Sequence, residues 1–171
     1  KPLFSIPSFR ESIRCIAVSQ AFHLVVCGAS ESSDTSSFSS LLFCSINNRS
    51  FYKSVNLGEK MPNKVLLTPC WGFSLVQTKS IDQGKVKFNL ALFSSNGDLI
   101  REAKLNAEFL RWSSFRSKSG FDFVVAVDET LNVYAFEAFY LDIKKAIFKS
   151  KTQIVDLTYL EQEEVISIIT E

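Results

Sequence analysis

The sequence has no excess of charge of either sign. Nineteen lysine and arginine residues stand against 18 aspartate and glutamate residues, which gives a formal net charge of +1 at pH 7. A nucleic-acid-binding protein or a polybasic membrane anchor normally carries a strong positive field. The balance therefore argues against nucleic-acid partners, and we expect the partners to be proteins that bind local patches of the surface.

Histidine is nearly absent, and no motif for catalysis or cofactor binding is present. His23 is the only histidine, so a histidine-centred triad or a multi-histidine metal site would depend on this single residue. The six glycines are scattered along the chain, whereas a phosphate-binding loop needs several at close spacing. We expect a non-enzymatic protein with no catalytic residue, no metal site and no cofactor.

Closely spaced cysteines and long apolar runs are also missing. The four cysteines are Cys15, Cys27, Cys44 and Cys70, and no two of them form a CxxC motif. Three of the four fall in apolar runs, where a free cysteine packs as a small hydrophobic residue, so a reducing, cytosolic setting is expected. No apolar run approaches the roughly 18 residues that a membrane-spanning helix needs.

The chain is instead rich in short apolar strands, and the clearest of them form a hairpin within residues 107–140. Phe121–Asp128 and Leu131–Phe136 predict two strands around a polar break. Both faces of the first strand are largely apolar, although a sheet with one face in water would alternate apolar and polar residues. We therefore expect a further sheet packed on each face of this hairpin.

The same unit recurs along the chain. Matching first-strand positions are Cys15, Val65, Phe109 and Val155, which lie 50, 44 and 46 residues apart. A four-stranded unit of about 40–50 residues is typical of β-propeller blades. The sequence therefore predicts an all-β fold, a partial WD40-like β-propeller of about three and a half four-stranded antiparallel blades. The blades are expected at about residues 13–57, 63–105, 107–149 and, incomplete, 153–171.

Several segments carry narrower predictions. Gly28–Ser40 contains seven serines in 13 residues and is expected to form a surface loop, and Asn96-Gly97 predicts a hairpin. Spacings in Glu102–Trp112 and Tyr140–Phe148 would also suit short amphipathic helices, which leaves a mixed α+β domain as the alternative. Strands are predicted for both, with Ile143–Phe148 as the fourth strand of the third blade.

The chain is expected to be a fragment of a longer protein. It has no initiator Met and stops just after the apolar run Val165–Ile169. Three and a half blades cannot close a ring, which typically has four to eight of them. The remaining blades are expected elsewhere in the same polypeptide.

A family resemblance depends on the order and spacing of several short motifs. They are Ser8–Ile13 running into Cys15–Ser19, Thr68–Phe73 with Leu75-Val76, Ser95–Gly97, Gly120–Phe123 and Phe136–Tyr140. Together these motifs resemble the C-terminal WD40-type propeller of BEACH-domain proteins, the Beige/neurobeachin family. The chain departs from the pattern because no Trp-Asp dipeptide closes a third strand and no Gly-His pair opens a blade.

The resemblance implies a scaffold rather than an enzyme. Members of this family are large cytosolic factors that associate peripherally with membranes, including endosomal and lysosomal ones. They act in vesicle trafficking and lysosome-related membrane dynamics, with the propeller as a protein-binding platform. A BEACH module is then expected in the same full-length chain.

The expected partner-binding residues are an aromatic run and two lysines, Phe136, Phe139, Tyr140, Lys144 and Lys145. Aromatic residues dominate binding hot spots. The simpler explanation for these three aromatic residues is that they pack in the core of a strand and at the edge of a blade. Lys144 and Lys145, with Lys149 and Lys151 nearby, suggest a peripheral membrane-binding module of the phosphoinositide-binding type as an alternative function.

A propeller glycoside hydrolase is a weaker alternative, because such an enzyme needs two carboxyl groups that face one substrate. The carboxylates of the expected turns are Asp82, Asp98, Asp122, Asp128, Glu129 and Glu137. Carboxylates in turns are usually solvated.

Overall fold

The computed structural model describes residues 12–32, 37–143, 145–160 and 165–171 of the chain. Within these residues all the elements are strands, and no helix is present that could span a membrane. The first sheet contains β1 (Ser12–Ser19), β2 (Leu24–Ser32), β3 (Ser37–Ser45) and β4 (Ser50–Gly58). The second contains β5 (Met61–Leu67), β6 (Ser74–Asp82), β7 (Lys85–Phe93) and β8 (Leu99–Leu105).

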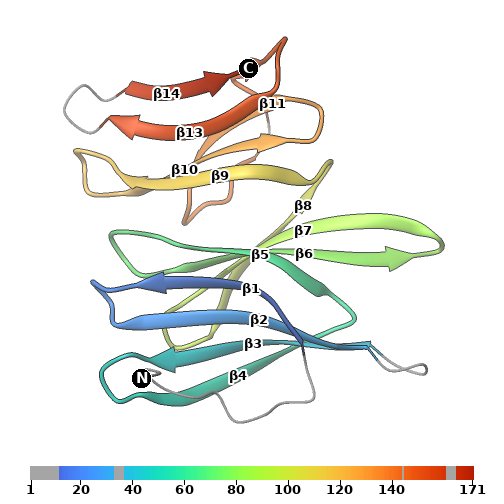
Figure 1. The fold of residues 1–171 in the computed structure, drawn as a ribbon, viewed down its shortest axis with the longest axis vertical. Helices are drawn as coiled ribbons and strands as arrows, with labels where there is room; N and C mark the ends of the chain where they lie inside the picture. Colours follow the sequence, from blue (N-terminus) through green and yellow to red (C-terminus); the bar gives the residue numbers. More distant parts are fainter. Residues whose placement is uncertain (1–11, 33–36, 144, 161–164) are drawn as a thin grey trace.

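The third sheet contains β9 (Phe109–Arg116), β10 (Asp122–Asp128), β11 (Asn132–Glu137) and β12 (Phe148–Lys149), and the fourth β13 (Ile154–Leu160) and β14 (Val165–Thr170). In every sheet, strands that follow each other in sequence pair antiparallel. The four sheets stack one on another along the long axis of the molecule (Figure 1). The first strands are neighbours, because β1 lies against β5, β5 against β9 and β9 against β13. This is the predicted all-β arrangement of propeller blades, with a two-stranded fourth sheet.

Most of the core lies between the sheets, as the strands that are apolar on both faces predicted. Side chains alternate between the two faces of a strand. On β10, Val124 and Ala126 pack against Leu75 of the second sheet, while Val125 and Val127 pack against the fourth sheet. A separate cluster of buried side chains joins the first and second sheets. Each middle sheet is therefore held on both faces by its neighbours.

The strand directions give the stack two chemically different ends. The turns β5–β6 and β9–β10 and the segment after β11 lie at one end, which we call the aromatic end because they carry Trp71, Phe121, Phe139 and Tyr140. The turns β6–β7 and β10–β11 and the connection from β8 to β9 lie at the other end, which we call the polar end. Residues from different blades therefore meet at each end.

The described parts of the serine-rich segment Gly28–Ser40 are not the surface loop that its composition predicted, and residues 33–36 lie outside the described part of the chain. Gly28–Ser32 belongs to β2 and Ser37–Ser40 to β3, and the two stretches pair with each other. Ser30, Ser39 and Ser40 are buried. The prediction was wrong because a serine side chain is small enough to pack in a sheet once a partner strand satisfies its backbone.

The segment Ile143–Phe148 was also predicted incorrectly. Only Phe148-Lys149 pairs with β11, through Asn132 and Val133, and the described residues before it are not in a strand. Ile147 and Phe148 are exposed, so no packing favours a longer strand there. The helical alternative fails as well, because Glu102–Trp112 is divided between β8 and β9.

The Asn96-Gly97 hairpin is confirmed. Gly97 has a φ of 81° and joins β7 to β8, and its N–H donates to the carbonyl oxygen of Ser94 at 3.0 Å. A Cβ atom at Gly97 would lie 2.9 Å from Cγ of Lys53 in the first sheet. The turn therefore needs glycine for its backbone conformation and for its close approach to the neighbouring blade.

Candidate protein-interaction site

At the aromatic end, a buried carboxylate from the third sheet holds a turn of the second. Asp122 begins β10 and is 3% exposed. Its Oδ1 accepts a hydrogen bond from the backbone N–H of Cys70 at 2.7 Å, and its Oδ2 accepts one from that of Trp71 at 3.1 Å. Hydrogen bonds to an ionised group are about twice as strong as neutral ones. Asp122 therefore fixes the turn that carries Trp71.

The same turn is fixed on its other side by the first sheet. Gly72 has a φ of 63°, and a Cβ atom there would lie 2.7 Å from Cγ of Phe22 in the β1–β2 turn. The Thr68 side chain closes the turn from within, because its Oγ1 accepts a hydrogen bond from the N–H of Phe73 at 3.1 Å. Trp71 is thus presented by a turn that three blades hold in place.

An apolar pocket of about 290 Å³ lies at this end, between the second and third sheets. Its aromatic walls are Trp71, Phe73, Phe121, Phe139 and Tyr140. Trp71 stacks on Phe73 at 6.5 Å between ring centroids, and Phe139 meets Tyr140 edge to face at 5.4 Å. Aromatic pairs prefer these two geometries. The rings therefore form an ordered wall, which we call the aromatic pocket.

The aromatic pocket carries negative charge at its lining, and arginine side chains lie near it. Asp122 and Glu137 line it. Within the described part of the chain, the Glu137 carboxylate has no ion-pair or hydrogen-bond partner. The Arg101 guanidinium, from β8, lies 5.3 Å from the ring centroid of Phe139 and 5.9 Å from that of Tyr140. The electron-rich faces of these rings thus already attract a cation.

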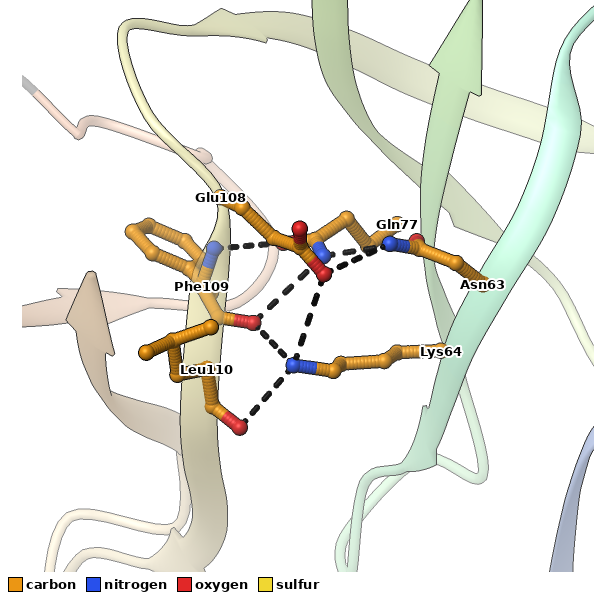
Figure 2. Close-up of polar contacts among 6 residues, drawn as sticks. All are labelled: Asn63, Lys64, Gln77, Glu108, Phe109 and Leu110. Carbon is orange, nitrogen blue, oxygen red and sulfur yellow. Dashed lines mark hydrogen bonds and ion pairs between the residues drawn. The ribbon is translucent and has the colours of Figure 1, made fainter. Parts of the chain in front are cut away.

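Nearer the polar end, a network that we call the polar joint connects β5 and β6 to β9. Its members are Asn63, Lys64, Gln77, Glu108, Phe109 and Leu110 (Figure 2). Gln77 is fully buried, and its Oε1 accepts the backbone N–H of Phe109 at 2.9 Å. Its amide group donates to Asn63 Oδ1 at 3.3 Å and to the carbonyl oxygen of Phe109 at 3.4 Å.

A lysine completes the polar joint. Figure 2 shows the Lys64 side chain reaching from β5 to β9, where Nζ donates to the carbonyl oxygens of Phe109 and, at 2.9 Å, of Leu110. Glu108 lies 3.8 Å from Nζ and also accepts a hydrogen bond from Asn63 at 2.9 Å. Burial lowers the pKa of Lys64, and the Glu108 charge opposes this shift. The joint therefore uses its polar groups internally, which indicates a structural role.

The structure divides the five residues that the sequence predicted for partner binding. Phe139 and Tyr140 are exposed and line the aromatic pocket, and Lys145 is exposed close by in sequence. Phe136 is 3% exposed and packs in the core, so it is not available to a partner. Lys144 lies outside the described residues.

Sequence reasoning missed the other three aromatic walls, Trp71, Phe73 and Phe121. Trp71 and Phe121 occupy the turn after the first strand in consecutive blades. The repeat spacing already indicated that such turns are equivalent, and equivalent turns of neighbouring blades lie at the same end of a propeller. That signal could have placed Trp71 and Phe121 together.

The described residues gather no cluster of histidine, cysteine and carboxylate side chains that could hold a metal ion. The four cysteines are free. Burial raises the pKa of the Cys15, Cys27 and Cys70 thiols to about 11, and Asp122 adds to the shift at Cys70. A thiol with a raised pKa is a poor nucleophile at neutral pH.

Two turn carboxylates, Asp122 and Glu137, line the aromatic pocket, and a glycoside hydrolase needs two carboxyl groups that face one substrate. Both oxygens of Asp122, however, accept backbone hydrogen bonds. Asp128 is also occupied, since it accepts hydrogen bonds from Thr130, Asn132 and Tyr134. These contacts assign Asp122 and Asp128 to the support of turns.

No model of a protein family matches this chain, and no curated protein sequence does. Solved structures match the fold. The computationally designed protein Ika4 aligns with a TM-score of 0.57 and 12% identity, over 99% of this chain and 98% of Ika4. BBS1N, solved in complex with ARL6DN, aligns with a TM-score of 0.46 and 12% identity, over 98% of this chain and 65% of BBS1N.

Sqt1 from Chaetomium thermophilum aligns with a TM-score of 0.39 and 13% identity, over 76% of this chain and 44% of Sqt1. The chain thus spans less than two thirds of the length of BBS1N and of Sqt1. Sqt1 has also been solved bound to the N-terminus of the ribosomal protein L10.

Proposed function

We propose that this chain is a non-enzymatic scaffold that binds proteins through the aromatic end of its blades. The observation that carries the proposal is the set of exposed aromatic side chains around one pocket. Trp71 is 60% exposed, Tyr140 58%, Phe121 47% and Phe139 38%. Aromatic side chains provide much of the binding energy at protein interfaces and cluster in pockets there. Large exposed apolar patches mark interaction sites in soluble proteins.

The rigidity of the support favours the same function. Asp122 holds the Trp71 turn from the third sheet, and Phe22 packs against that turn from the first. A surface that is already ordered loses less conformational entropy when a partner binds. The aromatic pocket is therefore suited to recognise an extended segment of a partner protein.

Selection of displayed random peptides on the folded chain tests this function whatever the identity of the partner. Selected peptides are expected to bind with micromolar Kd and to lose at least tenfold in affinity when Trp71→Ala or Tyr140→Ala is introduced. Phe148→Ala is the matched control, because Phe148 is 50% exposed but lies outside the pocket. Peptides that bind all three variants equally would contradict the proposed site.

We further propose, from the sequence motifs, that the chain belongs to a BEACH-type scaffold of vesicle trafficking and lysosome-related membranes in the cytoplasm. The support is the order and spacing of Thr68–Phe73, Gly120–Phe123 and Phe136–Tyr140. The coding sequence upstream of Lys1 tests this assignment. A BEACH module there would support it, and an unrelated domain in its place would refute it.

Contact with a membrane surface is a second candidate function, favoured by a specific observation in the third sheet. Ile147 is 61% exposed and Phe148 50%, and the exposed Lys145, Lys149 and Lys151 flank them. Exposed apolar residues between lysines suit the surface of an anionic membrane.

Co-sedimentation with vesicles that contain phosphatidylserine tests this second function. We expect binding that is lost when Lys144, Lys145, Lys149 and Lys151 are all changed to Glu. Equal, negligible sedimentation of the two proteins would rule the function out.

A further inference from the structure

The aromatic pocket is small enough to suit a single side chain. Its volume of about 290 Å³ is at the lower limit of small-molecule sites, which run from roughly 300 to 1,000 Å³. Such a pocket fits a single side chain better than a cofactor. Because Asp122 uses both carboxylate oxygens in hydrogen bonds to Cys70 and Trp71, Glu137 is the lining group that remains open to a ligand.

The lining combines two features that attract a cation. The faces of Trp, Tyr and Phe rings are electron-rich and bind cations, Trp most strongly. Glu137 supplies a negative charge from the end of β11, and it forms no ion pair within the described residues. A half-buried carboxylate gains most when a ligand brings the opposite charge and a hydrogen-bond donor together.

The molecule contains an internal example of the cation that these rings bind. The Arg101 guanidinium lies over Phe139 and Tyr140 at 5.3 and 5.9 Å, although Arg101 does not line the pocket. A guanidinium is planar, more weakly hydrated than an ammonium, stacks on aromatic rings and pairs with carboxylates through two parallel hydrogen bonds. Rings and carboxylate together therefore favour guanidinium over the compact ammonium of lysine.

We infer that the aromatic pocket takes the arginine side chain of a partner protein, with the guanidinium on the Trp71 and Tyr140 rings and paired with Glu137. This inference rests on the proposed function and specifies the partner: an exposed protein segment with an arginine anchor. The uncharged isostere citrulline has nearly the same shape as arginine. It therefore separates recognition of a cation from recognition of an apolar stem.

Titration with three short peptides tests the inference. The peptides are identical except for arginine, lysine or citrulline at the central position. Trp112→Phe makes Trp71 the only tryptophan, so its fluorescence reports binding in the pocket. The arginine peptide is expected to bind about tenfold more tightly than the citrulline peptide, with the lysine peptide between them.

Two carboxylate variants make the test specific. Glu137→Gln is expected to weaken the arginine peptide about tenfold and to leave the citrulline peptide unchanged. Glu129→Gln is the control, because Glu129 is an exposed carboxylate at the polar end. It is expected to change neither affinity.

The outcomes distinguish this inference from the proposed function. Equal binding of arginine and citrulline peptides, or no effect of Glu137→Gln, overturns the arginine inference. Displayed peptides that lack arginine and still depend on Trp71 would do the same and leave the interaction site intact. If the three peptides fail to bind and displayed peptides ignore Trp71→Ala, both proposals fail.

Discussion

The aromatic pocket and the polar joint both connect the second blade to the third. They differ in whether their side chains have partners within the molecule. In the polar joint, Gln77 and Lys64 direct their donors to backbone carbonyl groups of β9. In the aromatic pocket, the Asp122 carboxylate accepts hydrogen bonds from the backbone N–H groups of Cys70 and Trp71, but the Trp71 ring and the Glu137 carboxylate have no such internal partner. Polar groups with internal hydrogen-bond partners hold the blades together, whereas exposed aromatic rings are available to a partner.

The two regions therefore predict opposite kinds of mutational effect. Changes to groups with internal partners should reduce the free energy of unfolding. Changes to open groups should leave it nearly constant and affect binding instead. The expected loss of stability is therefore largest for buried groups with internal partners and smallest for exposed ones.

Asp122→Ala is expected to have the largest effect, because Asp122 is buried and both of its carboxylate oxygens have internal partners. It removes two charge-assisted hydrogen bonds to the Trp71 turn, which should reduce the free energy of unfolding by about 3 kcal/mol. Urea denaturation measures the loss. Asp98→Ala changes an exposed turn carboxylate and should stay within about 0.5 kcal/mol. Equal stability of the two variants would show that Asp122 does not hold the turn.

Gln77→Leu tests the polar joint and should reduce the free energy of unfolding by about 2 kcal/mol. The leucine fills the space but leaves the buried N–H of Phe109 without its acceptor, and an unsatisfied buried group is costly. Urea denaturation is again the measurement. Gln153→Leu, at an exposed position, is the control, and a similar loss there would contradict the structural role.

Asp128 predicts a loss of stability in acid. Burial raises its pKa, but hydrogen bonds from Asn132, Thr130 and Tyr134 outweigh burial and leave the pKa below the ordinary value. The ionised form therefore stabilises the fold above about pH 4, the ordinary aspartate pKa. This contribution is lost as the pH falls through the lowered pKa.

Thermal unfolding between pH 5 and pH 2 measures this dependence. The Asp128→Asn variant should be less stable at pH 7 and should lose less stability on acidification. A variant with the same acid dependence as the unmodified protein would show that Asp128 does not contribute to it.

Trp71→Ala should have the smallest effect on stability and a large one on binding. Trp71 is 60% exposed, so its removal should change the free energy of unfolding by about 0.5 kcal/mol. Peptide binding at the pocket should still fall at least tenfold. A loss of several kcal/mol would mean that the ring supports the fold, and the contrast between the two regions would then fail.

Much of the fold could be predicted from the repeat of strands that are apolar on both faces. Val124 and Val125 point in opposite directions, and both are buried because a sheet covers each face. Composition misled the prediction at Gly28–Ser40, where the described residues of β2 and β3 pair with each other, and at Ile143–Phe148, where Ile147 and Phe148 are exposed. Local sequence does not reveal whether another strand or sheet packs against a segment.

The candidate site was only partly predictable. Phe139 and Tyr140 are adjacent in sequence and were found as an aromatic run, but Trp71 and Phe121 are 50 residues apart and belong to different blades. Their meeting depends on the strand directions and on the hydrogen bonds from the Trp71 turn to Asp122. Phe136 was predicted to contact a partner but is buried. The core residues that cover it include some that are remote in sequence, so its burial could not be predicted locally.

The strand pattern, the repeat and the near-neutral charge were predictable because they follow from the spacing and kind of side chains along the chain. Which aromatic residues are exposed together, and which carboxylate has hydrogen-bond partners, could be seen only in the folded molecule. Burial and hydrogen bonding depend on neighbours in space, and packing of the blades brings together residues that are about one repeat apart in the chain.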